Sequence, residues 1–201
     1  MYRIHKKDEF YTRMAHEEGY PARSVYKLKE MDEKFRLFRS GDKVLDLGCA
    51  PGSWMMYISE KIGNSGKVVG VDRSELKIPL KSNMRFIEQS VMDFKKEDFA
   101  GMKFDLVVSD LAPQTTGIKI SDEVRSVELC DTALDIAAAL LLPDGIFVCK
   151  IFEGEMIRDF HKRIKARFKR FKIFKPKAVI KGSKEIYLLG FGLLPGFAKG
   201  N

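Results

Sequence analysis

The chain has 201 residues, of which 45% are hydrophobic and 32% are charged. This composition is typical of one folded domain and excludes a disordered chain. Charged residues and a proline interrupt the most apolar stretch, residues 133–152, so we expect no membrane span, and the first ten residues lack the apolar core of a signal peptide. Three cysteines without ligand-like spacing favour the reducing cytoplasm and predict no bound metal.

The predicted elements alternate between helix and strand along most of the chain. Helices are expected over 24–35, 54–62, 122–142 and 155–170, and strands over 43–47, 67–71, 84–87, 104–109, 146–151, 171–174 and 185–191. Such alternation predicts an α/β fold, a mostly parallel sheet with helices on both faces. We expect one domain, 1–201, that comprises a basic helical segment, 1–40, and a Rossmann-like core, 41–193.

Positive charge is concentrated at the two ends of the chain. The net charge is +8, yet residues 40–150 carry a net −4, whereas residues 1–39 carry +3 and residues 151–181 carry +8. This distribution favours a polyanionic partner such as RNA, although generic surface lysines would give the same total. No obligate protein partner is evident.

The segment 155–170 carries much of this charge. Four apolar residues recur at helical spacing, and four basic residues repeat the same spacing one position later. The apolar residues are Ile157, Phe160, Ile164 and Phe168, and the basic ones are Arg158, Lys162, Lys165 and Lys169. The pattern predicts an amphipathic helix. Its basic edge is either a row that contacts phosphates or an ordinary solvated face.

A glycine-rich loop, residues 46–54, joins the first predicted strand to the next helix. Its sequence begins with Asp46 and Gly48 and reaches the helix at Gly52. Glycines let the backbone approach a ligand closely. Asp72, at the end of the second strand, is positioned to accept the hydroxyl protons of a ribose.

Two nucleotide-like cofactors suit such a loop. A dinucleotide favours G-x-G-x-x-G, whereas this loop has G-x-x-x-G with a proline inside. S-adenosylmethionine has no phosphate and needs an acidic loop residue, a tight glycine turn and a ribose-binding acid. The pattern favours S-adenosylmethionine, with Asp93 placed after the third strand to bond the adenine amino group. A plain strand–helix turn is the alternative.

S-adenosylmethionine is a methyl donor, and a lysine inside an apolar strand indicates which kind of group receives the methyl. The motifs that hold an exocyclic base amine, or a cysteine nucleophile after proline, are absent. Lys150 instead interrupts the run Gly145–Phe152, and lysines are rarely buried without a partner or a task. A neutral lysine is a good general base for a hydroxyl, provided that burial or a second cation favours loss of its proton. The alternative is a lysine that extends from the strand end to solvent.

Five stretches together resemble the FtsJ/RrmJ-type ribose 2′-O-methyltransferases. They are residues 17–35, 46–54, 107–113, 145–155 and 183–189, which contain the motifs VYKLKE, DLGCAPGSW, SDLAP, VCKIF and SKEIY. The resemblance implies a Rossmann-like S-adenosylmethionine-dependent sandwich with a seven-stranded sheet and a reversed last strand. It implies a catalytic tetrad of Lys27, Asp110, Lys150 and Glu185. It also implies cofactor contacts by Gly52, Trp54, Asp72, Asp93 and Asp110.

The resemblance predicts an enzyme that needs no metal. Lys150 would draw the proton from a ribose 2′-hydroxyl while Asp110 and Glu185 orient the lysines and the substrate. Taken alone, Lys27 and Glu30 suit a surface helix pair, and Glu185 suits a charge on an edge strand.

The family also implies an RNA substrate. The compact chain resembles enzymes that methylate a uridine of large-subunit rRNA, and methylation of the tRNA anticodon loop is the first alternative. A non-catalytic RNA-binding module of the same fold is a second, and a nicotinamide-dependent oxidoreductase is disfavoured by the loop spacing.

Overall fold

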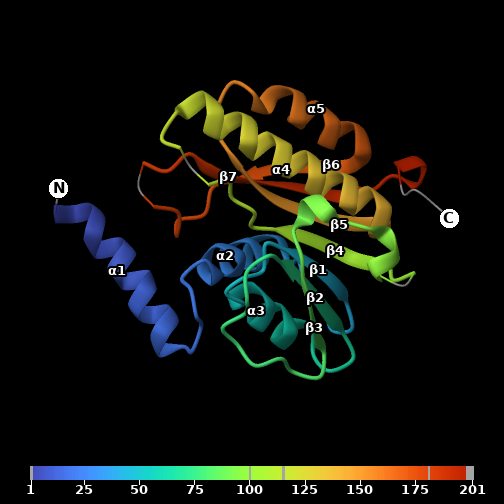
Figure 1. The fold of residues 1–201 in the computed structure, drawn as a ribbon, viewed down its shortest axis with the longest axis horizontal. Coiled ribbons are helices and arrows are strands. Elements are labelled where there is room, and N and C mark those ends of the chain that lie inside the picture. The colour runs from blue at the N-terminus through green and yellow to red at the C-terminus, as the bar shows by residue number, and fades with distance from the viewer. Residues whose placement is uncertain (1, 100, 115, 181, 198–201) are drawn as a thin grey trace.

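A computed structural model describes residues 2–99, 101–114, 116–180 and 182–197. Seven strands form one sheet in the order β3-β2-β1-β4-β5-β7-β6 (Figure 1). Their bounds are β1 Lys43–Leu47, β2 Lys67–Asp72, β3 Met84–Glu88, β4 Phe104–Ser109, β5 Leu141–Phe152, β6 Phe168–Phe174 and β7 Glu185–Leu193. Neighbouring strands from β3 to β5 are parallel, and β7 runs antiparallel to both of its neighbours. The predicted α/β fold with a reversed last strand is confirmed.

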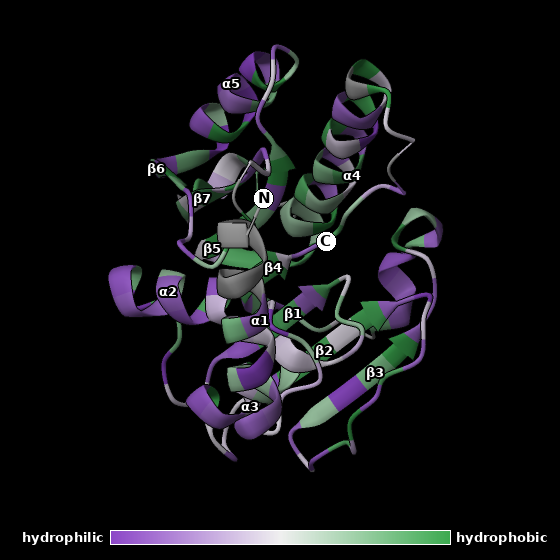
Figure 2. Cartoon of the chain, turned by 90° about the vertical axis from the view of Figure 1, so that its left-hand side faces the viewer, coloured by the Kyte–Doolittle hydropathy of each residue, from purple (hydrophilic) through white to green (hydrophobic). Residues whose placement is uncertain are grey.

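The helices cover both faces of this sheet. Their bounds are α1 Tyr2–Glu17, α2 Val25–Phe35, α3 Ser53–Ile62, α4 Lys119–Leu140 and α5 Ile157–Arg167, with short 3₁₀ turns at Val91–Asp93, Lys96–Phe99 and Pro195–Phe197. Two apolar clusters fill the space between the layers, one beneath α4 and α5 and the other beneath α2 and α3. Green predominates along the central strands and purple on the outer surface of α5 (Figure 2), as expected for a sheet that helices cover on both sides, whereas the edge strands β3 and β6 are mixed.

Two helix ends predicted from the sequence are wrong. The helix predicted over 122–142 ends at Leu140, because Leu141 already pairs with Phe104 of β4 as the first residue of β5. The helix predicted over 155–170 ends at Arg167, because Phe168 belongs to β6 and stacks on Phe147. In both cases pairing with a strand distant in the sequence outweighs local helical periodicity.

This second boundary divides the predicted basic row. Arg158, Lys162 and Lys165 lie on α5, whereas Lys169 lies on β6 and pairs with Asp144 at 2.6 Å. Lys162 is paired as well, with Asp159 at 2.9 Å. The four residues therefore do not form one continuous row on a helix, and two of the charges are neutralised locally.

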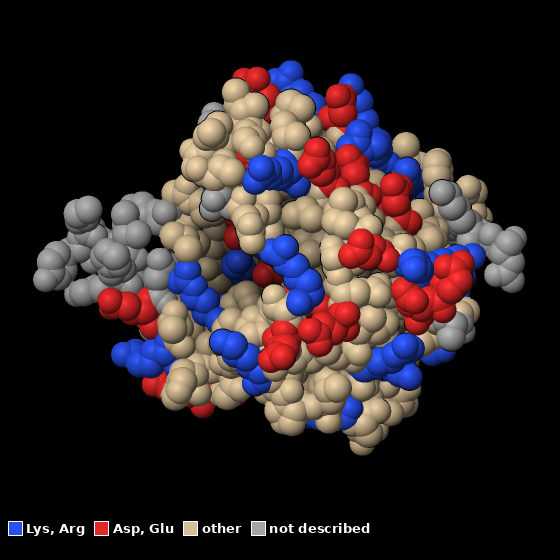
Figure 3. All heavy atoms as spheres, in the orientation of Figure 1, with Lys and Arg blue, Asp and Glu red and all other residues tan. Residues whose placement is uncertain are grey.

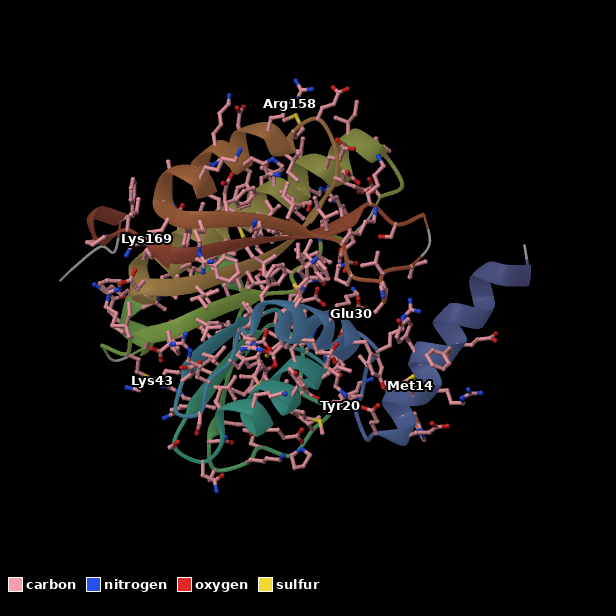
Figure 4. The ribbon with its side chains drawn as sticks, turned by 180° about the vertical axis from the view of Figure 1, so that it is seen from behind. Met14, Tyr20, Glu30, Lys43, Arg158 and Lys169 are labelled. Atoms are coloured by element: carbon pink, nitrogen blue, oxygen red, sulfur yellow. The ribbon has the colours of Figure 1, made fainter. Side chains whose placement is uncertain are left out.

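The amino-terminal helix α1 extends away from the sheet and meets the body near its carboxyl end (Figure 4). The Tyr11 ring lies 5.2 Å from the Tyr26 ring of α2, and Ala15 and Tyr20 are buried where the two parts meet. In the described ranges, none of the helices combines the length and the apolarity that crossing a membrane requires.

Candidate active site

Four ionisable side chains that are distant in the sequence meet at the carboxyl edge of the sheet. Lys27 of α2 pairs with Glu185 at the start of β7, with Nζ and Oε1 2.5 Å apart. Lys150 of β5 pairs with Asp110, which follows β4, with Nζ and Oδ1 3.1 Å apart. The structure thus brings all four predicted tetrad residues to one place, and each side chain is at most 16% exposed.

Tyr187 joins the two ion pairs, and it was not among the predicted site residues. Its hydroxyl lies 2.6 Å from Oδ1 of Asp110 and 2.9 Å from Oε1 of Glu185. A hydroxyl has one proton, so Tyr187 donates to one of these carboxylates at a time. The signal was present: residues two apart on a strand share a face, and Tyr187 lies two positions after Glu185.

Strand register explains why these groups converge. Lys150 lies opposite Tyr187 in the antiparallel ladder between β5 and β7, and opposite residues present their side chains to the same face. Asp110 reaches this face because its backbone N–H donates to the Leu47 carbonyl and its own carbonyl accepts from Lys150 Nζ at 2.6 Å. The backbone and the side chain of Asp110 therefore both hold Lys150.

The environment of Asp110 favours its charged form. Burial by itself would raise the pKa of Asp110, but the charges of Lys150 and Lys27 and the hydrogen bond from Tyr187 outweigh burial and lower the pKa. Burial and the two neighbouring carboxylates raise the pKa of Tyr187 well above its ordinary value, so its hydroxyl keeps its proton. The site therefore holds a charged Asp110 and a neutral Tyr187 at neutral pH.

A cavity of about 510 Å³ adjoins this cluster. It is lined by Gly48, Asp72 and Asp110 at the ends of three neighbouring strands and by Met92 in the turn after β3. The cavity lies beyond the carboxyl ends of the parallel strands, where this class of sheet binds its ligands. Figure 3 shows a hollow in one face between α2 and the start of β7, with acidic and basic side chains inside it and lysines or arginines at its rim.

Asp46 lies beneath the cavity as a buried, unpaired carboxylate. It is 0% exposed, and neither carboxylate oxygen has a hydrogen-bond partner in the described part of the chain. Burial, followed by the charges of Asp110 and Asp72, raises the pKa of Asp46 well above its ordinary value. Unsatisfied buried carboxylates are costly, so this one indicates a place where a ligand with positive charge or donor groups is received.

The other predicted cofactor residues lie around this cavity without lining it. Gly52 precedes α3 with a φ of 113°, and a Cβ there would lie 2.6 Å from Ile78. The glycine is thus required by the fold of the loop itself. Asp93 is exposed on the rim, next to Met92.

Trp54 is buried and is not among the residues that line the cavity. Its indole N–H donates to the Ser24 carbonyl at 2.9 Å, and its ring lies 6.0 Å from that of Tyr187. Ser53 accepts from the Ala22 N–H at 2.7 Å. The loop after β1 is thereby attached to the segment that carries Lys27.

The simpler interpretations of Lys27 and Glu185 are wrong. Glu30 accepts hydrogen bonds from the Lys177 and Ala178 N–H groups at 2.7 Å each, and Lys27 pairs with Glu185 instead. Glu185 is not on an edge strand, because β7 lies between β5 and β6. Across the described residues, no cluster of three or more His, Cys, Asp or Glu side chains is arranged to hold a metal.

The strand order, the reversed β7 and a cavity at the carboxyl edge define a Rossmann-like methyltransferase. The family model for FtsJ-like methyltransferase matches residues 20–193. A relative from Desulfatibacillum aliphaticivorans, named ribosomal RNA large subunit methyltransferase E, is 48% identical over 185 residues, which cover 91% of this chain and 89% of the relative. A protein of the same name from Desulfosudis oleivorans is 44% identical over 92% of this chain and 91% of its own length.

Solved structures agree with this assignment. A ribosomal RNA methyltransferase from Plasmodium falciparum superposes with a TM-score of 0.77 at 29% identity, over 87% of this chain and 99% of that one. Fibrillarin, in its complex with Nop5p, shares the fold at 18% identity with a TM-score of 0.60, over 84% of this chain and 83% of that one. The chain belongs to the FtsJ-like methyltransferase family.

Proposed function

We propose that this enzyme transfers the methyl group of S-adenosylmethionine to a ribose 2′-hydroxyl of large-subunit ribosomal RNA, in the cytoplasm. The single observation that carries the reaction type is the cluster of Lys27, Asp110, Lys150 and Glu185, joined by Tyr187 beside a large cavity. The names of the curated relatives support large-subunit RNA over tRNA as the substrate.

The residues around the cavity suit S-adenosylmethionine. Three carboxylates, those of Asp46, Asp72 and Asp110, lie at or beneath the cavity, and this cofactor has a positively charged sulfur and an ammonium group. Asp72 would accept the ribose hydroxyls and Asp93 would bond the adenine amino group, while Gly48, Gly52 and the backbone at Trp54 would shape the loop around the cofactor. When bound, S-adenosylmethionine supplies an electrophilic methyl group and leaves as a neutral thioether.

The chain's own residues would then position a hydroxyl and take its proton. Lys150, in its amine form, would accept the proton of the ribose 2′-hydroxyl as that oxygen attacks the methyl carbon. The Asp110 carboxylate and carbonyl would fix the Lys150 nitrogen, and Glu185 would do the same for Lys27, which faces the substrate hydroxyl from α2. Holding both reactants in line supplies much of the acceleration, because the bond that forms and the bond that breaks share one carbon.

Methyl transfer from labelled cofactor tests this function. Purified large ribosomal subunits and bulk tRNA, both from cells that lack the enzyme, serve as substrates, and labelled sites are mapped as 2′-O-methyl nucleotides. We expect label in the large-subunit RNA. Label confined to tRNA would favour the alternative substrate, and cofactor binding without transfer to either RNA would favour a non-catalytic module.

A further inference from the structure

A second cavity opens at the same edge of the sheet, on the face that α4 covers. Its volume is about 250 Å³. It is lined by Asp122 and Glu123 of α4, by Phe152 at the end of β5, and by Ser183 and Lys184 just before β7. The reaction described above does not use this cavity.

The cavity shares its strands with the tetrad. Phe152 follows Lys150 by two residues, and Lys184 directly precedes Glu185. Successive strand residues point to opposite faces. Because Glu185 faces Lys27, its neighbour Lys184 faces α4, where its Nζ lies 3.2 Å from Oε1 of Glu123. Lys184 and Glu185 therefore point to opposite sides of the chain at the start of β7, whereas Phe152 lies on the same side of β5 as Lys150.

Glu123 is held tightly in place. Its side chain is 8% exposed, and a Cβ at Gly154 would lie 2.2 Å from its carboxylate carbon. Its partner Lys184 is 44% exposed, so solvent screens the pair and the pair contributes little to stability. A pair retained at the edge of an active site is better explained by a ligand that it contacts.

The remaining polar groups define what that ligand is. Asp122 is occupied, because it accepts from Thr116 and from the Gly117 N–H. Lys184 donates to one oxygen of Glu123 and has further N–H groups that can donate. The Ser183 hydroxyl accepts from the Glu185 N–H, so the hydroxyl proton of Ser183 can still be donated to a ligand. A ligand thus meets an acceptor and two donors next to an aromatic side chain.

We propose that this cavity receives an unpaired base of the RNA substrate, from a nucleotide that flanks the methylated one. A phosphate would be repelled by Glu123 and Asp122, and a metal cation by Lys184. The polar edge of a base instead presents donors beside acceptors, and single-stranded RNA is read through such edges and through stacking on aromatic side chains. Glu123 would accept from the base, Lys184 and Ser183 would donate to it, and Phe152 would contact its ring. This inference rests on the proposed function.

Kinetics with two variants and a matched control test the inference. Glu123→Gln and Lys184→Gln each remove one charge from the cavity, while Lys169→Ala breaks the exposed ion pair with Asp144 at the opposite edge of the sheet (Figure 4). With large subunits from cells that lack the enzyme, we expect KM for RNA to rise about tenfold in both cavity variants, the loss of one charge-assisted hydrogen bond. The turnover number, cofactor affinity and the Lys169→Ala control should stay within about twofold of wild type.

A second measurement uses the wild-type protein and therefore does not depend on how the variants fold. RNA with 4-thiouridine on either side of the methylated nucleotide is irradiated in the complex, and the inference predicts a crosslink to the peptide that contains Phe152 or Ser183. Crosslinks only to other peptides, or cavity variants that match Lys169→Ala in KM, would overturn the inference while methylation by wild type continues. Absence of methylation by wild type would instead overturn the proposed function.

Discussion

Replacing Tyr187 with Phe removes one hydroxyl and leaves the aromatic ring that packs near Trp54. The hydroxyl is hydrogen-bonded at 2.6 Å to Asp110 and lies 2.9 Å from Glu185. A hydrogen bond to a charged group contributes about 1.5–3 kcal/mol, and removing the desolvated hydroxyl itself offsets part of that loss. We therefore expect Tyr187→Phe to lower the free energy of unfolding by about 1–2 kcal/mol at pH 7, equivalent to roughly 3–6 °C in Tm.

The same variant changes the pH dependence of stability. The pKa of Asp110 is lowered in the folded state. Its ionised side chain therefore stabilises the fold above the pKa of the unfolded chain, about 3.9, and this stabilisation is lost as pH falls through the lower pKa of the folded state. Tyr187→Phe removes one of the interactions that lower this pKa. The stability difference between wild type and variant should therefore shrink between pH 7 and pH 3, as measured by urea denaturation at each pH.

Tyr57→Phe is the matched control for this prediction. Tyr57 is buried on α3 and donates to Asp32 at 2.7 Å, and Asp32 is not a tetrad residue. Both variants should lose similar stability, but only Tyr187→Phe should also reduce methyl transfer, by about three- to tenfold, since the two tetrad carboxylates lose their common partner. A Tyr187→Phe variant with the free energy of unfolding of wild type, or an equal loss of activity in Tyr57→Phe, would refute the role assigned to the Tyr187 hydroxyl.

Three further substitutions test the cofactor side of the site. Trp54→Phe removes the hydrogen bond from the indole N–H to the Ser24 carbonyl and should reduce turnover several-fold, with cofactor affinity unchanged in isothermal titration. A change in affinity without a change in turnover would contradict this prediction. Gly52→Ala places a Cβ at a φ of 113°, and it should lower the free energy of unfolding by at least about 1 kcal/mol and weaken cofactor binding. A variant with the Tm of wild type would show that alanine is not strained at this position. Asp46→Asn removes a carboxyl group whose pKa is raised on folding, and the resulting cost in stability grows as pH rises above about 3.9. The variant should therefore gain more stability at pH 8 than at pH 4 and bind cofactor more weakly, and equal gains at both pH values would contradict the raised pKa.

Strand patterns predicted the sheet and singled out Lys150, and they placed Asp110 at a strand end, while the role of Asp110 in a tetrad came from the resemblance. Asp110 follows a run of apolar strand residues and Lys150 interrupts another, so each is conspicuous in the sequence. Parallel strands then bring both to one edge. The helix end at Leu140 was not predictable, because it depends on the pairing of Leu141 with Phe104.

The other half of the tetrad has no such local signal. Lys27 lies on an amphipathic helix and Glu185 at a strand start, and both have ordinary surroundings in sequence. Only the resemblance to a known family indicated them. Their 2.5 Å contact exists because α2 packs over the sheet beside β7, a tertiary arrangement that periodicity does not specify.

The central claim is that Lys150 accepts the proton of the substrate hydroxyl, and the most direct measurement compares Lys150→Ala with wild type in single-turnover methyl transfer at saturating S-adenosylmethionine and RNA. The account predicts that the variant binds both ligands with near wild-type affinity and loses at least about a hundredfold in the rate of transfer, as expected for a general base. A variant that binds both ligands and transfers methyl at a near wild-type rate would contradict the account.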